Sequence, residues 1–197
     1  MRGAVRRVLI FGYYGFRNTG DEAILAGMLR DLRGEIPDLE AIVVSGDPAG
    51  TSRDHGVRAV LFTDVPRLID AARESDAILR GGGGLFHDYW GAEAETVLSP
   101  EHGSLSFVSA APLLSALLDK PLMVYAVGVG PLETETGRRM TRAAFEQASV
   151  ATVRDEASLR VLQNAGFDAA GVVVTADPAF RLESAPPDLA AATWQRE

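Results

Sequence analysis

Short apolar runs alternate with segments of helical periodicity along nearly the whole chain. The apolar runs predicted as strands are Val5–Phe11, Ala41–Ser45, Val57–Leu61, Ala77–Leu79, Leu122–Val127, Val150–Val153 and Val172–Thr175. Helices are predicted over Gly20–Arg33, Val65–Glu74, Ser104–Leu118, Thr136–Gln147 and Glu156–Ala165. Continuous apolar strands separated by helices are typical of a parallel sheet with helices on both faces. The pattern therefore predicts a doubly wound α/β fold.

The segment Gly12–Leu25, GYYGFRNTGDEAIL, joins the first predicted strand to the first predicted helix. Thr19 and Glu22 have the spacing of a helix capping box. A strand, a glycine-rich turn and a helix start direct free backbone N–H groups at one point, which favours a site for an anionic or polyhydroxylated ligand. Asp21 and Glu22 replace the Lys and Ser or Thr of a Walker loop, and Tyr14 interrupts the dinucleotide fingerprint. Neither of those nucleotide loops is predicted.

Other boundaries follow from Gly, Pro and Asp. Asp64 and Asp155 are predicted helix caps. The segment Gly81–Gly103 carries four consecutive glycines and no clear periodicity. Loops of this length are usually functional lids or disordered. Residues 1–182 are predicted as one domain, and 183–197 as a hinge leading into a short helix.

Composition narrows the function classes further. The formal charge of -8 argues against general nucleic-acid affinity, and zero cysteines exclude disulfides and favour a reducing cytosol. No signal peptide is visible, and the longest apolar stretch, Phe107–Leu118, is too short to cross a bilayer. A cytoplasmic protein is predicted. Contact with the inner face of the membrane through a partner, and a homo-oligomer, both stay open.

The unusual residues follow strands, at the edge where open α/β sheets bind ligands. Arg154 offers planar, bidentate donors to a carboxylate or phosphate, and carboxylates can orient or deprotonate hydroxyls. The catalytic candidates are Asp21, Asp88 and Arg154. The substrate-binding candidates are Gly12, Tyr13, Tyr14, Gly15, Asn18, Gly20, Glu22, Gly82, Gly83, Gly84, His87, Gly128, Gly130 and Asp177. No metal-ligand spacing occurs, so no metal site is predicted.

Each candidate also has a structural interpretation. Asp21 and Glu22 lie in the first turn of a helix, where carboxylates are stabilised by the dipole. Arg154 is followed by Asp155 and can form an ion pair with it. Asp177 precedes a proline and can shape a turn. The sequence leaves these alternatives open.

Taken in order, five segments resemble the polysaccharide pyruvyl transferase family, in particular its CsaB type. They are GYYGFRNTGDEAIL at Gly12–Leu25, RGGGGLFHD at Arg80–Asp88, AVGVGP at Ala126–Pro131, VRDEASLRVL at Val153–Leu162 and TADPAF at Thr175–Phe180. The resemblance implies transfer of the enolpyruvyl unit of phosphoenolpyruvate onto sugar hydroxyls, which forms a pyruvate ketal and releases phosphate without a cofactor. For the CsaB type, the implied acceptor is a lipid-linked cell-wall glycan, and the pyruvylated polymer anchors S-layer proteins.

The resemblance also implies two Rossmann-like domains facing across a cleft, as in GT-B glycosyltransferases. This chain resembles the amino-terminal domain, so a carboxyl-terminal half with further donor contacts is expected. Two alternatives remain: a nucleotide-sugar glycosyltransferase of GT-B architecture, and a non-catalytic glycan-binding module.

Overall fold

Eight parallel strands form one sheet in the computed structural model, which describes residues 5–93, 96–97 and 105–184. The strands are β1 (Arg7–Tyr14), β2 (Glu40–Ser45), β3 (Arg58–Leu61), β4 (Ala77–Arg80), β5 (Gly83–Phe86), β6 (Leu122–Val129), β7 (Val150–Val153) and β8 (Val172–Val174). Their order is β3-β2-β1-β4-β6-β7-β8, and β5 pairs with the second half of β6. This Rossmann-like order confirms the predicted α/β class.

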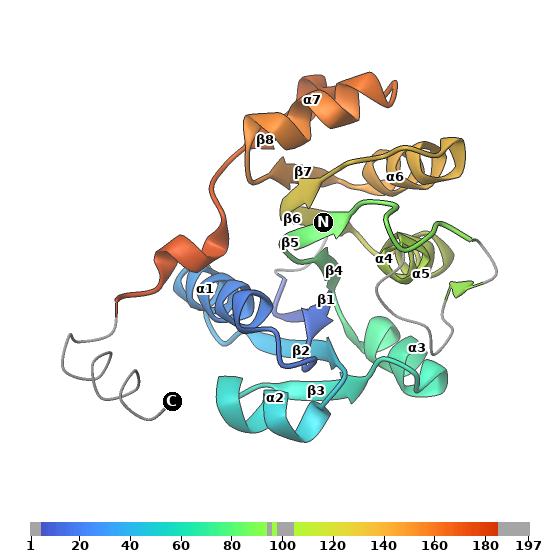
Figure 1. The fold of residues 1–197 in the computed structure, drawn as a ribbon. Coiled ribbons are helices and arrows are strands. Elements are labelled where there is room, and N and C mark those ends of the chain that lie inside the picture. The colour runs from blue at the N-terminus through green and yellow to red at the C-terminus, as the bar shows by residue number, and fades with distance from the viewer. Residues whose placement is uncertain (1–4, 94–95, 98–104, 185–197) are drawn as a thin grey trace.

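Helices cover both faces of the sheet (Figure 1). They are α1 (Thr19–Glu35), α2 (Pro48–His55), α3 (Val65–Glu74), α4 (Leu105–Val108), α5 (Ala110–Leu118), α6 (Glu135–Gln147) and α7 (Glu156–Asn164), with short 3₁₀ turns η2 (Ala169–Gly171) and η3 (Pro178–Arg181). One hydrophobic cluster joins α1 to the sheet, and a larger one joins α3, α5 and α6 to the opposite face.

The two clusters follow from the two-residue period of the strands. Leu9 and Ile42 belong to the larger cluster, whereas Ile10 and Val43 belong to the cluster under α1. Strands buried on both faces must be apolar at every position, which is why they appear in the sequence as continuous apolar runs. Each fully buried Val, Leu or Ile contributes about 1.5–3 kcal/mol.

Two of the predicted helix caps are confirmed, and the capping box is wrong. The side chain of Asp64 accepts from the Arg67 N–H of α3, and that of Asp155 accepts from the Ser158 N–H of α7. The N-cap of α1 is Asn18, one residue earlier than predicted, and its side chain accepts from two N–H groups of the first turn. Glu22 turns away from the cap and binds the preceding loop instead.

Three further boundaries differ from the prediction. Strand β1 continues through Gly12 to Tyr14 with an irregular register, whereas the sequence predicted a turn from Gly12. The single helix predicted over 104–118 is split at Ser109, because Pro112 has no N–H to donate to the carbonyl four residues earlier. The loop predicted over 81–103 contains β5, whose two glycines have no apolar side chains to signal a strand.

Helix α2 was absent from the prediction because its core contact is small and polar. Its buried residues are Gly50 and Thr51, so it has no apolar stripe. The sequence did carry its caps: Asp47 accepts from Gly50 N–H, and Gly56 ends the helix in the left-handed region at φ 63°. The hinge predicted over 183–197 lies outside the described residues except for its first two.

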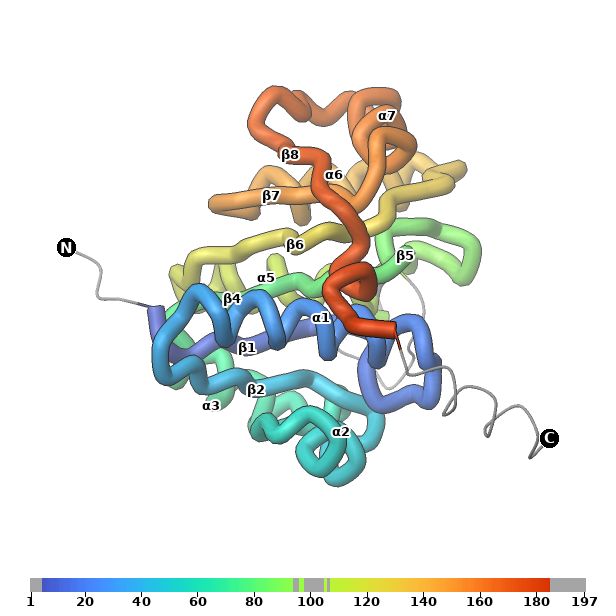
Figure 2. The backbone as a smooth tube through the Cα atoms, turned by 90° about the vertical axis from the view of Figure 1, so that its left-hand side faces the viewer, coloured from blue at the N-terminus to red at the C-terminus, as the bar shows by residue number. Residues whose placement is uncertain are grey.

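The strand order places a crevice at the carboxyl ends of β1 and β4. Strand β1 leads into α1 on one face, and the chain after β4 leads through β5 toward α4 and α5 on the other. Figure 2 shows the segment after β8 returning across this edge to pack on α1. That return brings Asp177 beside the start of α1.

We predict opposite effects for two alanine substitutions in α1. Alanine is favoured over glycine in helices by about 1 kcal/mol. At Gly34 nothing lies within 4 Å of a new Cβ, so Gly34→Ala should raise the free energy of unfolding by up to about 1 kcal/mol. At Gly27 the Cβ overlaps the backbone carbonyl of Pro178, so Gly27→Ala should lower it by about 1–3 kcal/mol. Urea denaturation measures both, and equal stabilisation by the two variants would contradict the docking of η3 on Gly27.

Candidate functional site

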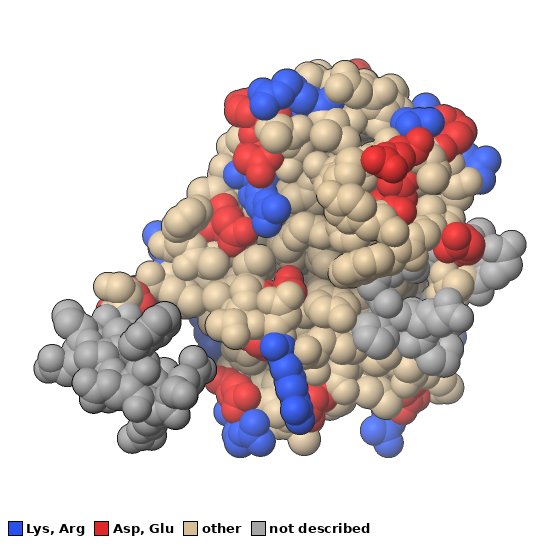
Figure 3. All heavy atoms as spheres, viewed as in Figure 1, with Lys and Arg blue, Asp and Glu red and all other residues tan. Residues whose placement is uncertain are grey.

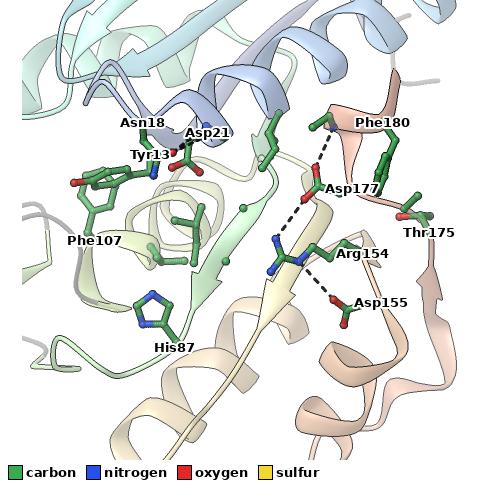
Figure 4. A pocket seen from close by; sticks show the side chains of 18 of the residues that line it. Tyr13, Asn18, Asp21, His87, Phe107, Arg154, Asp155, Thr175, Asp177 and Phe180 are labelled. Atoms are coloured by element: carbon green, nitrogen blue, oxygen red, sulfur yellow. Dashed lines mark hydrogen bonds and ion pairs between the residues drawn. The ribbon is translucent and has the colours of Figure 1, made fainter. Parts of the chain in front are cut away.

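A cavity of ≈ 720 Å³ opens at the carboxyl edge of the sheet, a size within the usual range for small-ligand sites. Its walls come from the end of β1, the first turn of α1, β5, and the loops after β7 and β8 (Figure 4). The lining residues are Tyr13, Asn18, Gly20, Asp21, Ile24, Gly83, Gly84, Leu85, His87, Trp90, Phe107, Val108, Arg154, Asp155, Thr175, Ala176, Asp177, Ala179 and Phe180. Figure 3 is drawn from the same side as Figure 1 and shows most charged side chains toward the margin of the face in view.

Asp21 is a buried carboxylate in the first turn of α1. It is 9% exposed, and its side-chain oxygens make no hydrogen bond within the described parts of the chain. Gly83, at φ 114°, gives it room, because a Cβ there would lie 2.9 Å from Asp21 Oδ1. Burial raises the pKa of Asp21 to about 6, although the positive charge of Arg80 opposes the rise. A carboxyl group that titrates there can exchange protons near neutral pH.

Arg154 lies between two carboxylates after β7 (Figure 4). Its Nη1 is 3.3 Å from Asp177 Oδ2, and its Nε is 3.5 Å from Asp155 Oδ2. The guanidinium packs flat against Gly128, where a Cβ would come within 2.8 Å of it. Asp177 also accepts from Ala179 N–H and so anchors η3. These contacts fix the plane of the guanidinium and leave Nη2 toward the cavity beside Gly84.

His87 and aromatic side chains form another wall. The Nδ1 atom of His87 is buried without a hydrogen-bond partner in the described residues, and burial lowers the pKa of the ring. His87 therefore stays neutral at pH 7. Trp90 packs edge-on against His87 with ring centroids 5.2 Å apart and is 68% exposed. Phe180, on the segment after β8, is 84% exposed. Exposed aromatic faces suit the apolar faces of sugar rings.

The loop after β1 is fixed by Glu22 of α1, whose carboxylate also contacts α2. Glu22 Oε1 accepts from the Gly15 N–H at 2.7 Å, and Glu22 Oε2 lies 2.9 Å from His55 Nε2. Tyr13 stacks on Phe16 with ring centroids 4.3 Å apart. His55, interpreted from the sequence as a turn residue, is instead the last residue of α2 and a partner of Glu22. These contacts position the loop that follows β1, while Tyr13 lines the cavity from the end of β1 itself.

The cavity gathers about half of the residues predicted as functional. Those that line it are Tyr13, Asn18, Gly20, Asp21, Gly83, Gly84, His87, Arg154 and Asp177. Those that do not are Gly12, Tyr14, Gly15, Glu22, Gly82, Asp88, Gly128 and Gly130. Within the second group, Gly128 leaves space for the Arg154 guanidinium, and Glu22 binds the Gly15 N–H in the loop between Tyr13 and Asn18.

The glycines outside the lining mark close packing. Gly130, at φ 100°, faces Val161 of α7, and Gly82 packs on Ile24 of α1. Gly12 accommodates the ring of Tyr14, whose side chain is fully buried and turned away from the cavity. Glycine is needed at these positions because other parts of the protein pack closely against the backbone there, and not because the backbone lines the cavity.

Asp88 holds the start of α6. Its carboxylate accepts from Glu133 N–H at 2.9 Å, Thr134 N–H at 2.7 Å and the Thr134 hydroxyl at 2.6 Å. Thr134 in turn accepts from Gly137 N–H as the N-cap of the helix. Burial alone would raise the pKa of Asp88, but these hydrogen bonds lower it. The carboxylate is fully engaged, so its geometry is that of a structural group.

Most of the lining residues that were not predicted are apolar or aromatic, and the two polar ones are Asp155, predicted only as a helix cap and ion-pair partner, and Thr175. Ile24, Leu85, Phe107 and Val108 appeared as core residues, and Trp90 lay in a stretch without periodicity. Thr175 and Phe180 fall inside the TADPAF segment but were given no role. Aromatic residues beside a glycine run were the one available signal.

Two negative findings concern the part of the chain described by the structure. None of its helices is long and apolar enough to span a bilayer. No cluster of three His, Asp or Glu side chains within residues 5–93, 96–97 and 105–184 is placed to hold a metal ion.

Known structures share the fold. HepE from Anabaena, solved in complex with UDP and glucose, aligns with a TM-score of 0.59 at 14% identity, covering 97% of this chain and 50% of HepE. A putative UDP-N-acetylglucosamine 2-epimerase from Listeria monocytogenes aligns with a TM-score of 0.54 at 16% identity, covering 95% of this chain and 51% of that one. These likenesses show an α/β fold that spans about half the length of each of those two chains.

The chain belongs to the polysaccharide pyruvyl transferase family, whose model matches residues 18–194. A curated relative is the amylovoran biosynthesis protein AmsJ of Erwinia amylovora, 23% identical over 215 residues. The alignment covers 88% of this chain and 48% of AmsJ. The chain thus spans about half the length of that relative. The family resemblance predicted from the five segments is confirmed.

We predict that Asp21→Asn stabilises the protein at neutral pH. The pKa of Asp21 rises from 3.8 to about 6 on folding, so the folded state binds the proton more tightly. The resulting stability is present below pH 4 and is lost as the pH rises through 6. At pH 7.5 the variant should gain on the order of 1–3 kcal/mol in the free energy of unfolding, and at pH 4 almost none. Urea denaturation at the two pH values tests this, and an equal gain at both would contradict it.

Asp88→Asn should have the opposite effect. The amide group places N–H donors against those of Thr134, so the free energy of unfolding at pH 7 should fall by about 1–3 kcal/mol. Because folding lowers the pKa of Asp88, this difference should shrink as the pH falls below about 4. Asp70→Asn, on the exposed face of α3, is the matched control and should change stability by less than about 0.5 kcal/mol. A loss no larger than the control's would remove Asp88 from this structural role.

Proposed function

We propose that the protein transfers the enolpyruvyl group of phosphoenolpyruvate onto hydroxyls of a cell-wall polysaccharide sugar and so forms a pyruvate ketal. Family membership supports the reaction class. The observation that carries the proposal is Asp21, a desolvated carboxyl group with a pKa of about 6 on the wall of the cavity. Ketal formation begins with loss of a proton from a sugar hydroxyl, and such a group is suited to accept it.

In the proposed reaction, each proton transfer and bond change takes place at a defined atom of the two substrates. Asp21 accepts the proton of one acceptor hydroxyl as its oxygen bonds to C2 of phosphoenolpyruvate, while C3 gains a proton and becomes a methyl group. The C2–O bond to phosphate then breaks, a second hydroxyl of the same sugar bonds to C2 and closes the ketal, and the departing phosphate takes up the proton of that hydroxyl. The acid that protonates C3 is assigned to no described residue of this chain.

The net charge of the cavity lining favours binding of the acceptor sugar, and not of the anionic donor, at the centre of the cavity. Among the described residues, the lining carries the carboxylates of Asp21, Asp155 and Asp177 against one guanidinium, that of Arg154. A trianion such as phosphoenolpyruvate needs an excess of cationic donors, whereas neutral sugar hydroxyls are well matched by carboxylates. The exposed rings of Trp90 and Phe180 add surfaces on which a sugar can stack.

Arg154 is proposed to meet the donor at the edge of the cavity. Asp155 and Asp177 hold its Nε and Nη1, and Nη2 makes no contact of this kind within the described residues. Nη2 is therefore available to the phosphate or carboxylate of phosphoenolpyruvate. The remaining cationic donors are expected from the part of the family's length that this chain does not span. S-layer anchoring and a lipid-linked acceptor remain implications of the CsaB-type resemblance.

Product analysis of the complete gene product tests the proposal. With an acceptor glycan, phosphate should be released from phosphoenolpyruvate, and no nucleoside diphosphate from sugar nucleotides. Asp21→Asn should lower kcat by about 10²–10⁴-fold. In the wild type, kcat should fall as the pH drops through about 6, because protonated Asp21 cannot act as the base.

The controls separate the alternatives. Arg67→Met, on an exposed position of α3, should leave turnover unchanged. Release of UDP from a sugar nucleotide would identify the protein as a glycosyltransferase. Binding of glycan without either product would identify a non-catalytic module.

A further inference from the structure

Arg80 is a buried guanidinium at the centre of the sheet. It is the last residue of β4, pairs in register with Phe11 of β1 and Val124 of β6, and is 1% exposed. All three guanidinium nitrogens lack a hydrogen-bond partner within the described residues. Arginine is almost never fully buried unless it is paired, because desolvating its charge is costly. Arg80 is the first residue of the RGGGGLFHD segment, and no functional role was predicted for it.

Two other polar groups act on Arg80 electrostatically. They are the Tyr14 hydroxyl, also buried without a hydrogen-bond partner, and the Asp21 carboxylate. Burial lowers the pKa of Arg80 to about 10, and Tyr14 and Asp21 oppose the fall. Burial raises the pKa of Tyr14 well above its usual range. At pH 7 Arg80 is therefore a fixed positive charge, Tyr14 is neutral, and Asp21 is the group that Arg80 can stabilise.

Of the charges around Asp21, that of Arg80 is the strongest one that favours ionisation. The titratable groups that interact with Asp21 are Tyr13 and Tyr14 of β1, Glu22 of α1, Arg80 of β4, Arg154 after β7 and Asp177 after β8. Glu22 and Asp177 favour the neutral form. Arg154 favours the charged form but is already engaged by Asp155 and Asp177, whereas Arg80 forms no ion pair within the described residues.

We propose that Arg80 is a positioning residue that acts through Asp21: its unpartnered guanidinium is buried at the end of β4, directly before the glycine run in which Gly83 lies beside Asp21 Oδ1, and its charge stabilises that carboxylate. Arg80 is absent from the cavity lining, so it acts across the protein interior without touching substrate. The inference rests on the proposed role of Asp21 as the base. It explains how a desolvated carboxylate serves as a base at all, since burial alone would favour its protonated form.

The pH dependence of turnover in the complete gene product tests this role. Arg80→Met removes the charge and keeps an unbranched side chain. The acidic limb of kcat should move to higher pH by on the order of one unit, with kcat recovering at still higher pH. Arg80→Lys keeps a positive charge and should restore most of the shift. A uniform loss of kcat at every pH, with an unmoved limb, would show a merely structural role and overturn the inference.

A second measurement needs no Arg80 variant and no activity. In the wild-type 197-residue chain, the ¹⁵N shift of Arg80 Nε should follow the titration of Asp21, and this step should vanish in Asp21→Asn. The Nε signal of Arg67, exposed on α3, should stay flat and serves as the control. A flat Arg80 signal would overturn the inference. A titrating Arg80 signal in a protein that releases no phosphate from phosphoenolpyruvate would support the coupling and reject the proposed function alone.

Discussion

The desolvation of Asp21 is the constraint on which the chemistry of the cavity depends. The carboxylate is buried because Gly83 of β5 leaves space for it and because the segment after β8 returns to pack on α1. Burial would leave it protonated near neutral pH, and the charges of Arg80 and Arg154 oppose that tendency. The site therefore combines the desolvated carboxyl group of Asp21 with two cationic groups: Arg80, which is buried at the end of β4, and Arg154, which lies on the cavity wall.

The arrangement follows from the order of the strands. Where two adjacent parallel strands are followed by connections that lead to opposite faces of the sheet, a crevice forms at the carboxyl ends of those strands. Segments that are distant in the sequence meet there. The loop after β1, strand β5 and the loops after β7 and β8 all reach this edge, as Figure 2 shows. Glycine at 27, 83 and 128 permits the close approaches between them. A Cβ at 27 would overlap the backbone of Pro178, and a Cβ at 83 or 128 would displace the side chain of Asp21 or Arg154.

The fold was predictable from the sequence because buried parallel strands are continuously apolar, and the convergence of Asp21, Arg154 and Asp177 followed from that fold. Their partners were not predictable. Asp88 and Glu22 look like active-site carboxylates in the sequence, yet their oxygens are taken by Thr134 and Gly15, which lie elsewhere along the chain. Arg80 ends an apolar strand, and only three-dimensional burial reveals that it lacks a hydrogen-bond partner in the described structure.

The most direct test of this account is the pKa of the Asp21 carboxyl group in the folded chain, measured by carbon-13 NMR with Asp21→Asn to assign the signal. The account predicts a pKa of about 6, with Asp88 in the same spectra titrating below its usual range. A value for Asp21 near its ordinary 3.8 would mean that the carboxylate is solvated. The cavity would then lack the base on which the proposed reaction depends.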